Sequence, residues 1–392
     1  MVRWILRRLV RALMILLIYQ FLLFALIQAM PGDSVSTMMG LPPSLRQGFR
    51  DLFGLNDPLW EQYLRWMARF FTGDLGTTFR FPHRPVSQIL LEMAPPTLFL
   101  FLPATFISFG LGIRLGIHLG WKSGPRGRLR SFLEGGLIAL AVMSYNSFPL
   151  WLAFILVQIF ARRLRWFPAE KMLNFNRWIG VPVSPTQVMV LLFLTAVLMA
   201  LALAGWNRWV RRWRPRSPWM QRAGLPLLGA IAALGWHLSG LAPLALDLLW
   251  HLALPLATVV LFSFGETMLL MRLLMRQQAR EDYISFARAR GLPPARIRNR
   301  HMAPLAIMPI LTRFLIQLPF VLLGSLVVEL AFVWRGLGSA LLSAIDFHDI
   351  PVIMGIFSVV GILMLIAHGL LDVLHAWLDP RLRGGRGMGW IK

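Results

Sequence analysis

Long apolar runs separated by short basic segments dominate the chain. Eight runs are long enough to cross a bilayer as helices, because about 20 residues span a hydrocarbon core about 30 Å thick. They cover residues 12–29, 95–119, 135–160, 187–205, 224–244, 251–271, 304–332 and 352–376. Backbone polar groups inside lipid must be satisfied within the segment itself, which favours helices. The pattern predicts an all-α membrane protein with about eight transmembrane helices.

Composition supports lipid as the main solvent. Hydrophobic residues make up 57% of the chain and charged residues 15%, against about 25% charged residues in an average soluble domain. The net charge of +23 would suggest nucleic acid in a soluble protein, because lysine and arginine neutralise phosphates. Here the arginines cluster between apolar runs, so they indicate topology, and no nucleic-acid partner is expected. The run 12–29 lacks a small-residue cleavage site after it and is interpreted as an uncleaved first span.

Basic residues predict which segments face the cytoplasm. The segment between the sixth and seventh runs holds eight arginines from Arg272 to Arg300, more than any other connecting segment. The positive-inside rule places it in the cytoplasm, together with both termini and the segments 122–130 and 208–222. One segment, 161–186, carries Arg162, Arg163, Arg165, Lys171 and Arg177 on the side opposite to the one the rule favours.

The same reading divides the chain into six parts. A tail with the first span (1–30) precedes a small extracytoplasmic segment (31–94), which is either a structural cap or a docking surface for a soluble partner. The later parts are spans two and three (95–160), an insertion with two extra spans (161–250), a core with the basic loop 272–304 (251–383), and a cytoplasmic tail (384–392).

Nucleotide hydrolysis has no visible site in this sequence. A phosphate-binding loop ends in Gly-Lys-Ser/Thr, because backbone amides cradle the phosphates and the lysine reaches the terminal one. The three lysines, Lys122, Lys171 and Lys392, do not follow a glycine. We therefore expect no cofactor in this chain, and any ATP and magnesium to be bound by another subunit.

The basic loop is more than a plain connection. We predict that the sixth span continues as a helix to Arg290, that Gly291 takes the left-handed position after it, and that Pro293 and Pro294 start a second short helix. Two interpretations are open: an ordinary positive-inside anchor, or a helix-turn-helix across the inner membrane face that meets a partner.

A family resemblance favours the second interpretation. The run Tyr283-Ile284-x-x-Ala287-Arg288-Ala289-Arg290-Gly291-Leu292, with His301 and Pro304, resembles the cytoplasmic "EAA" loop of ATP-binding-cassette importer permeases in the dipeptide, oligopeptide and nickel family. Further motifs in the same order resemble that family across residues 1–160 and 246–383. They are Pro31-Gly32-Asp33, Gly54-Leu55-Asn56-Asp57-Pro58, Gly73-Asp74-Leu75-Gly76, Pro85-Val86, Pro96-Thr97-Leu98, Val328-Glu329, Asp349-x-Pro351-Val352 and Leu378-Asp379-Pro380-Arg381.

The resemblance implies a type I importer permease bundle with six family spans, in the bacterial cytoplasmic membrane. Such a permease has no catalytic residues and pairs with a second permease, two cytoplasmic ATPase subunits and an extracytoplasmic solute-binding protein. The ATPase-coupling residues would be Asp282, Tyr283, Ser285, Ala287, Arg288, Ala289, Gly291, Arg296, His301 and Pro304.

Two features depart from that family pattern. Ser285 occupies the position of the family's signature glutamate, so a salt bridge from that position is not expected. Residues 187–244 insert two extra spans, joined by the basic, tryptophan-rich stretch 206–214. That insertion is either a peripheral hairpin anchored at headgroups or a regulatory element.

Charged groups inside the spans require partners, because each costs at least about 2.5 kcal/mol at the bilayer centre. Glu266, Arg313 and Glu329 are candidates for the translocation path or for an intramembrane pair, and pairing of Glu266 with Arg313 is the favoured interpretation. A different class, an integral-membrane enzyme acting on lipid-linked substrates, would use Glu266, His368 and Asp372 for acid–base chemistry.

Two spaced sets of residues complete the sequence-based expectations. His368, Asp372, His375 and Asp379 share one helix stripe, which suits either helix-end hydrogen bonding and headgroup contact or, less simply, a transition metal. Gly112, Gly116 and Gly120 repeat every four residues and predict a close helix-packing face.

Overall fold

The structure is a computed structural model that describes residues 2–29, 47–48, 56–79, 84–121, 128–213, 218–324 and 326–378. Regular structure within these ranges is helical, apart from an isolated bridge between Thr77 and Pro85. The first half contains α1 (Val2–Gln28), α3 (Leu59–Thr72), α4 (Val86–Gly120), α5 (Arg128–Asn146), α6 (Pro149–Leu156), the π-helix η1 (Val157–Arg163) and α7 (Phe175–Trp178).

The second half begins with the hairpin α8 (Pro185–Trp213) and α9 (Pro218–Leu238) and the long helix α10 (Ala242–Gln278). It continues with α11 (Asp282–Ala289), α12 (Pro294–Arg296), the π-helix η2 (Ile297–Met302), α13 (Ala303–Gly324), α14 (Leu326–Ala331), α15 (Leu337–Asp346) and α16 (Ile350–Leu378).

The all-α membrane fold is confirmed, whereas the count of eight spans is not. Within the described residues six helices are long and apolar enough to cross a membrane: Val10–Gln28, Val86–Gly120, Pro185–Val210, Ala242–Gln278, Pro294–Pro319 and Ile350–Leu371. The run predicted at 224–244 corresponds to the shorter apolar helix Ala223–Leu238, since Gly240, with φ of 71°, turns the chain before α10 begins. The run predicted at 304–332 is divided between α13 and α14.

The span predicted at 135–160 is bent. Its two halves, Ser131–Asn146 and Pro149–Arg163, meet at 118°. Phe148 is extended before Pro149, because proline disfavours helical geometry in the residue before it and donates no hydrogen bond. The side chains of Asn146 and Ser147 bond back to the carbonyls of Val142 and Met143 and close the end of α5. This pair is one broken span or a re-entrant loop.

The core of the bundle is the contact between α4 and α10. A Cβ on Gly116 would lie 2.5 Å from the Cβ of Met271 and 2.8 Å from the carbonyl oxygen of Met268. Gly112 and Gly120 face Thr267 and Met275 in the same way. The predicted close-packing face is therefore confirmed, because only glycine lets the two backbones approach this closely.

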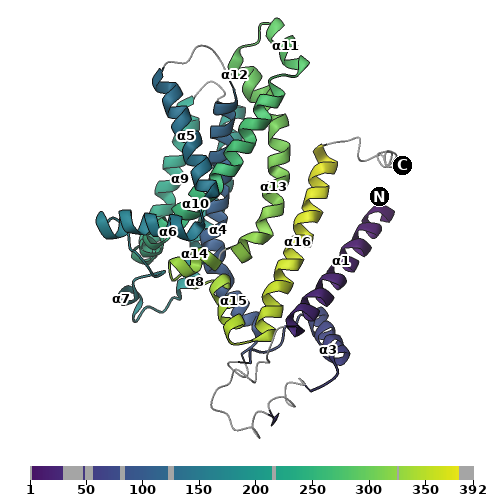
Figure 1. Ribbon diagram of the computed structural model, residues 1–392. Coiled ribbons are helices and arrows are strands. Elements are labelled where there is room, and N and C mark those ends of the chain that lie inside the picture. The colour runs from purple at the N-terminus through teal and green to yellow at the C-terminus, as the bar shows by residue number, and fades with distance from the viewer. Residues whose placement is uncertain are drawn as a thin grey trace.

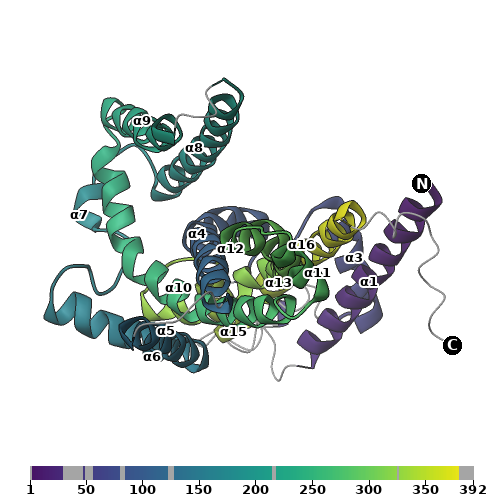
Figure 2. The same ribbon diagram turned by 90° about the horizontal axis from the view of Figure 1, so that it is seen from above.

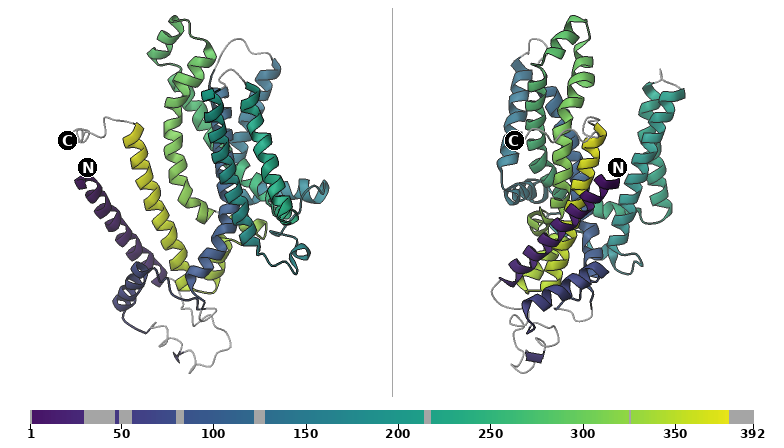
Figure 3. Two further views of the ribbon diagram at one scale, coloured as in Figure 1. Left: turned by 180° about the vertical axis from the view of Figure 1, so that it is seen from behind. Right: turned by 90° about the vertical axis from the view of Figure 1, so that its right-hand side faces the viewer.

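The helices are arranged so that one end of the molecule carries α11 and the opposite end carries α3, α7 and α15 (Figure 1). The start of α1 and the end of α16 point toward the α11 end (Figure 1). Seen from above, α8 and α9 stand as a pair beside the bundle (Figure 2), and the right-hand view of Figure 3 shows the same separation. The start of α8 is held to the bundle, because Val188 and Met189 are buried in the same hydrophobic cluster as Leu248 and Leu252 of α10.

The division of the chain into six parts stays a prediction. Of the segment 31–94, the described part includes α3, which packs on α1 through Tyr63 against Phe21 and Phe24. Gly73 ends α3 with φ of 79°, the left-handed conformation that glycine adopts without strain.

Candidate functional site

The segment between α10 and α13 forms a helical cap at one end of the bundle. Figure 1 shows α11 beyond the ends of the neighbouring helices, with α12 and η2 leading back into α13. We call residues 279–302 the cap.

The cap differs from the sequence-based expectation in one respect. A helix running without interruption from the sixth span to Arg290 is wrong: α10 ends at Gln278, and a turn over 279–281 precedes α11. The amides of Arg280 and Glu281 bond to carbonyls three residues back, at 3.0 and 3.2 Å, and Glu281 is extended. The turn lets α11 leave the axis of α10, so the cap is a separate helix instead of a tail of the span.

The turn after α11 was predicted correctly. Gly291 has φ of 70°, and its amide donates to the carbonyl of Arg288 at 2.9 Å, while the amide of Leu292 reaches Ala287 at 3.3 Å. A left-handed residue at this position closes the helix end by satisfying carbonyls that would otherwise lack partners. Pro294 then starts α12, as expected for proline in a first helical turn.

The inner face of α11 holds the cap on the bundle. Ile284 is fully buried and Ala287 nearly so, in a cluster with Met275, Ile297 and Met302. The guanidinium of Arg288 lies 5.6 Å from the ring centre of Trp121, at the end of α4, an attractive cation–π geometry. These contacts join the cap to both α4 and α10, the two helices of the central contact.

Tyr283 fixes the start of α11. Its hydroxyl donates to the Gln278 side-chain oxygen at 2.5 Å. Burial raises the pKa of the Tyr283 phenol, and the nearby Glu281 carboxylate raises it further. Tyr283 therefore stays protonated and able to donate across the physiological pH range.

The outer face of α11 is apolar at its centre and basic at its C-terminal end. Phe286 is 65% exposed although it is a large aromatic side chain. Ser285 and Ala289 are exposed beside it, and the guanidinium of Arg290 lies 5.8 Å from the Phe286 ring centre. An exposed aromatic flanked by arginine is the type of surface that dominates protein–protein contacts.

The ten residues expected to act in coupling divide between the two faces. Tyr283 and Ala287 face the bundle and hold the cap in place. The exposed ones are Asp282, Ser285, Arg288, Ala289, Gly291, Arg296, His301 and Pro304. Phe286, the most exposed large apolar side chain of α11, was not among the coupling residues expected from the sequence. Its place next to Ser285, the position of the family's glutamate, could have identified it.

The intramembrane pair expected from the sequence is present. A guanidinium nitrogen of Arg313 on α13 donates to the carboxylate of Glu266 on α10. The amide of Gln317 lies 3.5 Å from the other carboxylate oxygen. The Arg313 side chain is 46% exposed and that of Glu266 19%, so the pair lies on a surface of the chain. Whether it lines a translocation path stays a prediction.

Reversing the pair tests its role. We expect Glu266→Arg alone, or Arg313→Glu alone, to lower the yield of folded protein, because each places two like charges together inside the membrane. The double exchange should restore most of the yield, measured by size-exclusion chromatography in detergent. No rescue by the double exchange would show that the two side chains do not act as a pair.

Glu329 is part of a buried polar cluster. Its side chain is fully buried and accepts hydrogen bonds from the Thr97 hydroxyl at 2.6 Å and the Ser339 amide at 2.9 Å. The Thr97 oxygen accepts from the amide of Leu337 at 2.8 Å. Glu329 thus joins α4 to the start of α15, and its geometry supports a structural role rather than a pairing with Arg313.

The histidine stripe is only partly described. The Nδ1 atom of His368 lies 2.8 Å from the carbonyl oxygen of Met364, which is the helix-end hydrogen bonding expected as the simpler interpretation. The side chains of Asp372 and His375 and the whole of Asp379 lie outside the described residues. Among the described residues, no group of three or more histidine, cysteine, aspartate or glutamate side chains is placed to hold a metal ion.

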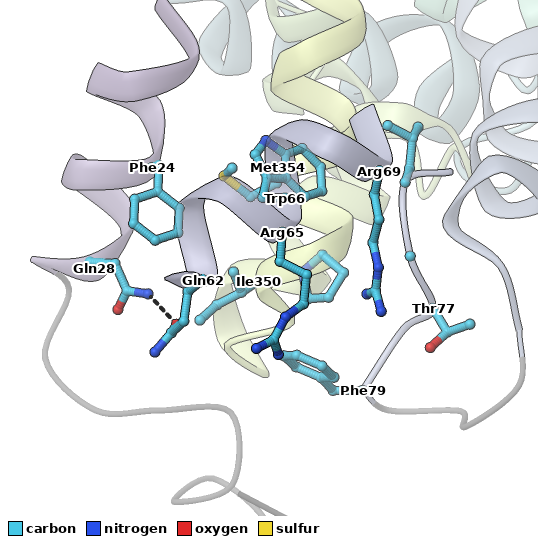
Figure 4. A pocket seen from close by; sticks show the side chains of 13 residues that line it. Phe24, Gln28, Gln62, Arg65, Trp66, Arg69, Thr77, Phe79, Ile350 and Met354 are labelled. Atoms are coloured by element: carbon cyan, nitrogen blue, oxygen red, sulfur yellow. Dashed lines mark hydrogen bonds between the residues drawn. The ribbon is translucent and has the colours of Figure 1, made fainter. Parts of the chain in front are cut away.

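A pocket of about 320 Å³ lies at the end opposite the cap. Figure 4 shows Phe24 and Gln28 of α1, Arg65 and Arg69 of α3, and Met354 of α16 around it. Gln28 donates to Gln62 at 3.0 Å, tying α1 to α3. The sequence reading missed this pocket, although Gln62, Arg65 and Arg69 recur at helical spacing on one face of α3.

The fold and the cap define a class. The chain is a bundle of apolar helices of the length that crosses a membrane, and it holds an amphipathic helix, α11, outside the bundle at one end. Comparison with known proteins extends this to a family. The family model described as "binding-protein-dependent transport system inner membrane component" matches residues 112–384, and the model of that component's N-terminal part matches residues 1–98. The chain belongs to this family.

Named relatives agree along almost the whole length. The chain is 26% identical over 384 residues to the oligopeptide transport system permease protein AppB of Bacillus subtilis (strain 168), covering 97% of this chain and 99% of the relative. It is 27% identical over 368 residues to the di/tripeptide transport system permease protein DppB of Pseudomonas aeruginosa (strain UCBPP-PA14), covering 93% and 94%. The probable D,D-dipeptide transport system permease protein DdpB of Escherichia coli (strain K12) is 27% identical over 369 residues, covering 93% and 92%.

These findings decide between the two classes left open by the sequence. The chain is a multi-pass, non-catalytic permease subunit of an ATP-binding-cassette importer. It works within a transporter complex that includes ATPase and binding-protein partners. The membrane enzyme acting on lipid-linked substrates is not supported.

Proposed function

We propose that this chain forms, with a second homologous permease, the path by which peptides or similar small solutes cross the bacterial cytoplasmic membrane. Two cytoplasmic ATPase subunits bind ATP and magnesium and drive the cycle, and an extracytoplasmic solute-binding protein delivers the solute. The peptide assignment rests on the relatives, which are named as oligopeptide, di/tripeptide and dipeptide permeases. Both termini and the cap lie on the cytoplasmic side.

The observation that carries this proposal is the two-faced cap. Its inner face is buried against α4 and α10, whereas its outer face exposes Phe286 and Arg290. Arg288 is also exposed, although its guanidinium lies over the ring of Trp121. The cap is therefore attached to the bundle on one side and free to bind another subunit on the other, as an element that transmits movement must be. When ATPase subunits close around the cap, its movement passes directly to α10 and α4, the most closely packed helices of the bundle.

Ser285 fits the same proposal. The position at which related permeases carry a glutamate is exposed on the outer face and carries a hydroxyl here. The grip on an ATPase groove then depends on apolar contact by Phe286 and on hydrogen bonds from the arginines. Asp282, in the first turn of α11, supplies a carboxylate close by.

Reconstitution tests the proposed function. The chain, its paired permease and the ATPase subunits are placed in liposomes with radiolabelled oligopeptide and the solute-binding protein. We expect peptide accumulation that requires both ATP on the ATPase side and the binding protein, at least about tenfold above a preparation without ATP, because uphill transport needs an energy input. Accumulation that proceeds equally without ATP or without the binding protein would contradict the proposal.

A further inference from the structure

A second pocket, of about 610 Å³, lies where the insertion meets the start of α10. Its walls are the aromatic side chains Trp166, Phe167 and Trp250, and its cationic side chains are Arg165 and Arg177. The volume lies within the range of about 300–1,000 Å³ typical of small-molecule sites. The importer function described above uses none of these residues, and neither the cap nor the pocket of Figure 4 includes them.

The floor of the pocket is a built polar cluster around Asp247, which is only 3% exposed. One carboxylate oxygen accepts from the Asn174 amide and the Trp178 indole, both at 3.0 Å. The other lies 3.7 Å from the guanidinium of Arg177 and 3.6 Å from Nδ1 of His251. The negative charge of Asp247 is therefore already compensated, and its effect is to hold Arg177 at the pocket, with 58% of that side chain still exposed.

The backbone at Arg165 is held in a tight turn. Its φ of 53° is left-handed, which costs about 1–2 kcal/mol for a residue other than glycine. The amides on either side of it hold this turn, because Leu164 donates to Ile159 at 3.0 Å and Trp166 donates to Phe160 at 2.9 Å. Arg165 forms no hydrogen bond or ion pair with the described part of the chain, so its guanidinium is available to a ligand.

The depth of the pocket follows from the length of α10. This helix has 37 residues, whereas about 20 cross the hydrocarbon core. Counting about 20 residues back from Arg272, the first arginine at the cap end, puts the other boundary near Leu252. Asp247, Trp250 and His251 then lie in the headgroup layer, and residues 165–177 precede the apolar span of α8, which starts at Pro185.

Charge identifies the class of ligand. Residues 161–186 carry five basic side chains and one acid, Glu170, on the side opposite to the one that the positive-inside rule favours. Exposed tryptophans at this level are typical of the membrane interface. Arginine binds phosphate through paired, charge-assisted hydrogen bonds.

We propose that this pocket binds the phosphate of an anionic phospholipid headgroup, in the leaflet opposite the cap, through Arg165 and Arg177, with Trp166 and Trp250 beside the glycerol and upper acyl chains. The bound lipid holds the insertion against α10. Its negative charge offsets the positive charge of residues 161–186, which the positive-inside rule disfavours on this side of the membrane.

Native mass spectrometry of the full chain with added phosphatidylglycerol tests this proposal. We expect Arg165→Gln with Arg177→Gln to weaken retention of the tightest-bound lipid by about tenfold or more, because two charge-assisted contacts are lost. The matched control is Arg162→Gln with Arg163→Gln, which removes the same charge from exposed positions of the same segment outside the pocket. The control should retain lipid much better than the pocket variant, since Arg162 and Arg163 are exposed to solvent, which screens their charges, and do not line the pocket.

A single-residue variant separates loss of lipid binding from loss of folding, and a competing anion separates a lipid from a free phosphate compound. Arg165→Gln alone leaves the Arg177–Asp247 pair intact, so weaker retention by this variant, with an unchanged melting temperature, reports on the ligand and not on folding. Equal loss in the pocket variant and the control would overturn the site, because only net charge would matter. Displacement of the lipid by glycerol phosphate at equal concentration would overturn the lipid assignment in favour of a free anion.

Discussion

Replacing Phe286 by aspartate is expected to abolish transport while leaving the chain folded. Phe286 is 65% exposed at the centre of the outer face of α11, so the change removes no core contact. A buried aromatic anchor at a protein interface contributes about 2 kcal/mol or more, and a carboxylate in its place would be desolvated without a partner. We expect uptake of labelled peptide by cells to fall below about a tenth, with loss of ATPase subunits from the purified complex.

Phe175→Asp is the matched control. Phe175 is 73% exposed on α7, at the opposite end of the molecule. The same change from phenylalanine to aspartate can therefore be made there without altering the cap. This variant's content of ATPase subunits should equal that of the unaltered chain. Normal transport by the Phe286 variant would show that the outer face of α11 does not carry the coupling contact.

Replacing Gly116 by alanine is expected to destabilise the bundle, whereas the same change at Gly110 is not. A Cβ at Gly116 meets the Met271 Cβ at 2.5 Å and a backbone oxygen at 2.8 Å, so α4 and α10 must separate. Overpacking of this kind costs about 1–3 kcal/mol. At Gly110, on the same helix, nothing lies within 4 Å. Alanine there should be neutral or stabilising, by up to about 1 kcal/mol, because it favours the helix.

Thermal unfolding of the two purified variants in one detergent measures this difference. We expect the melting temperature of the Gly116 variant to drop by several degrees and that of the Gly110 variant to stay or rise. Because the glycine face joins the two helices to which the cap is attached, the Gly116 variant should also lose transport. Equal melting temperatures for both variants would contradict the tight α4–α10 contact.

Features that depend on nearby residues were predictable from the sequence. The apolar runs gave α1, α4, α8, α10 and α16, because span length is set by bilayer thickness. The left-handed Gly291 and the glycine face of α4 followed from local spacing. The pair between Glu266 and Arg313, 47 residues apart, is an exception, because the cost of an unpaired charge in lipid predicted it.

Features that depend on distant contacts were not predictable. The partner of Glu329, Thr97, is 232 residues away, so the sequence could identify the carboxylate but not its role. The break over 279–281 contains neither glycine nor proline and is set by how Ile284 and Ala287 reach the cluster at the end of α4. Pro149 itself is a local signal for the bend. The apolar run continues on both sides of this proline, however, and was interpreted as one straight span.

The contact between the cap and an ATPase subunit can be measured directly by cross-linking. The chain has no natural cysteine, so Ser285→Cys on the outer face of α11 and Phe175→Cys at the opposite end each give a single reactive site in the permease. With a short thiol-reactive photo-crosslinker attached to that cysteine and activated in the assembled transporter, Ser285→Cys should give a covalent product with an ATPase subunit, and Phe175→Cys should give none. An ATPase product from position 175 and not from position 285 would contradict the assignment of α11 as the coupling helix.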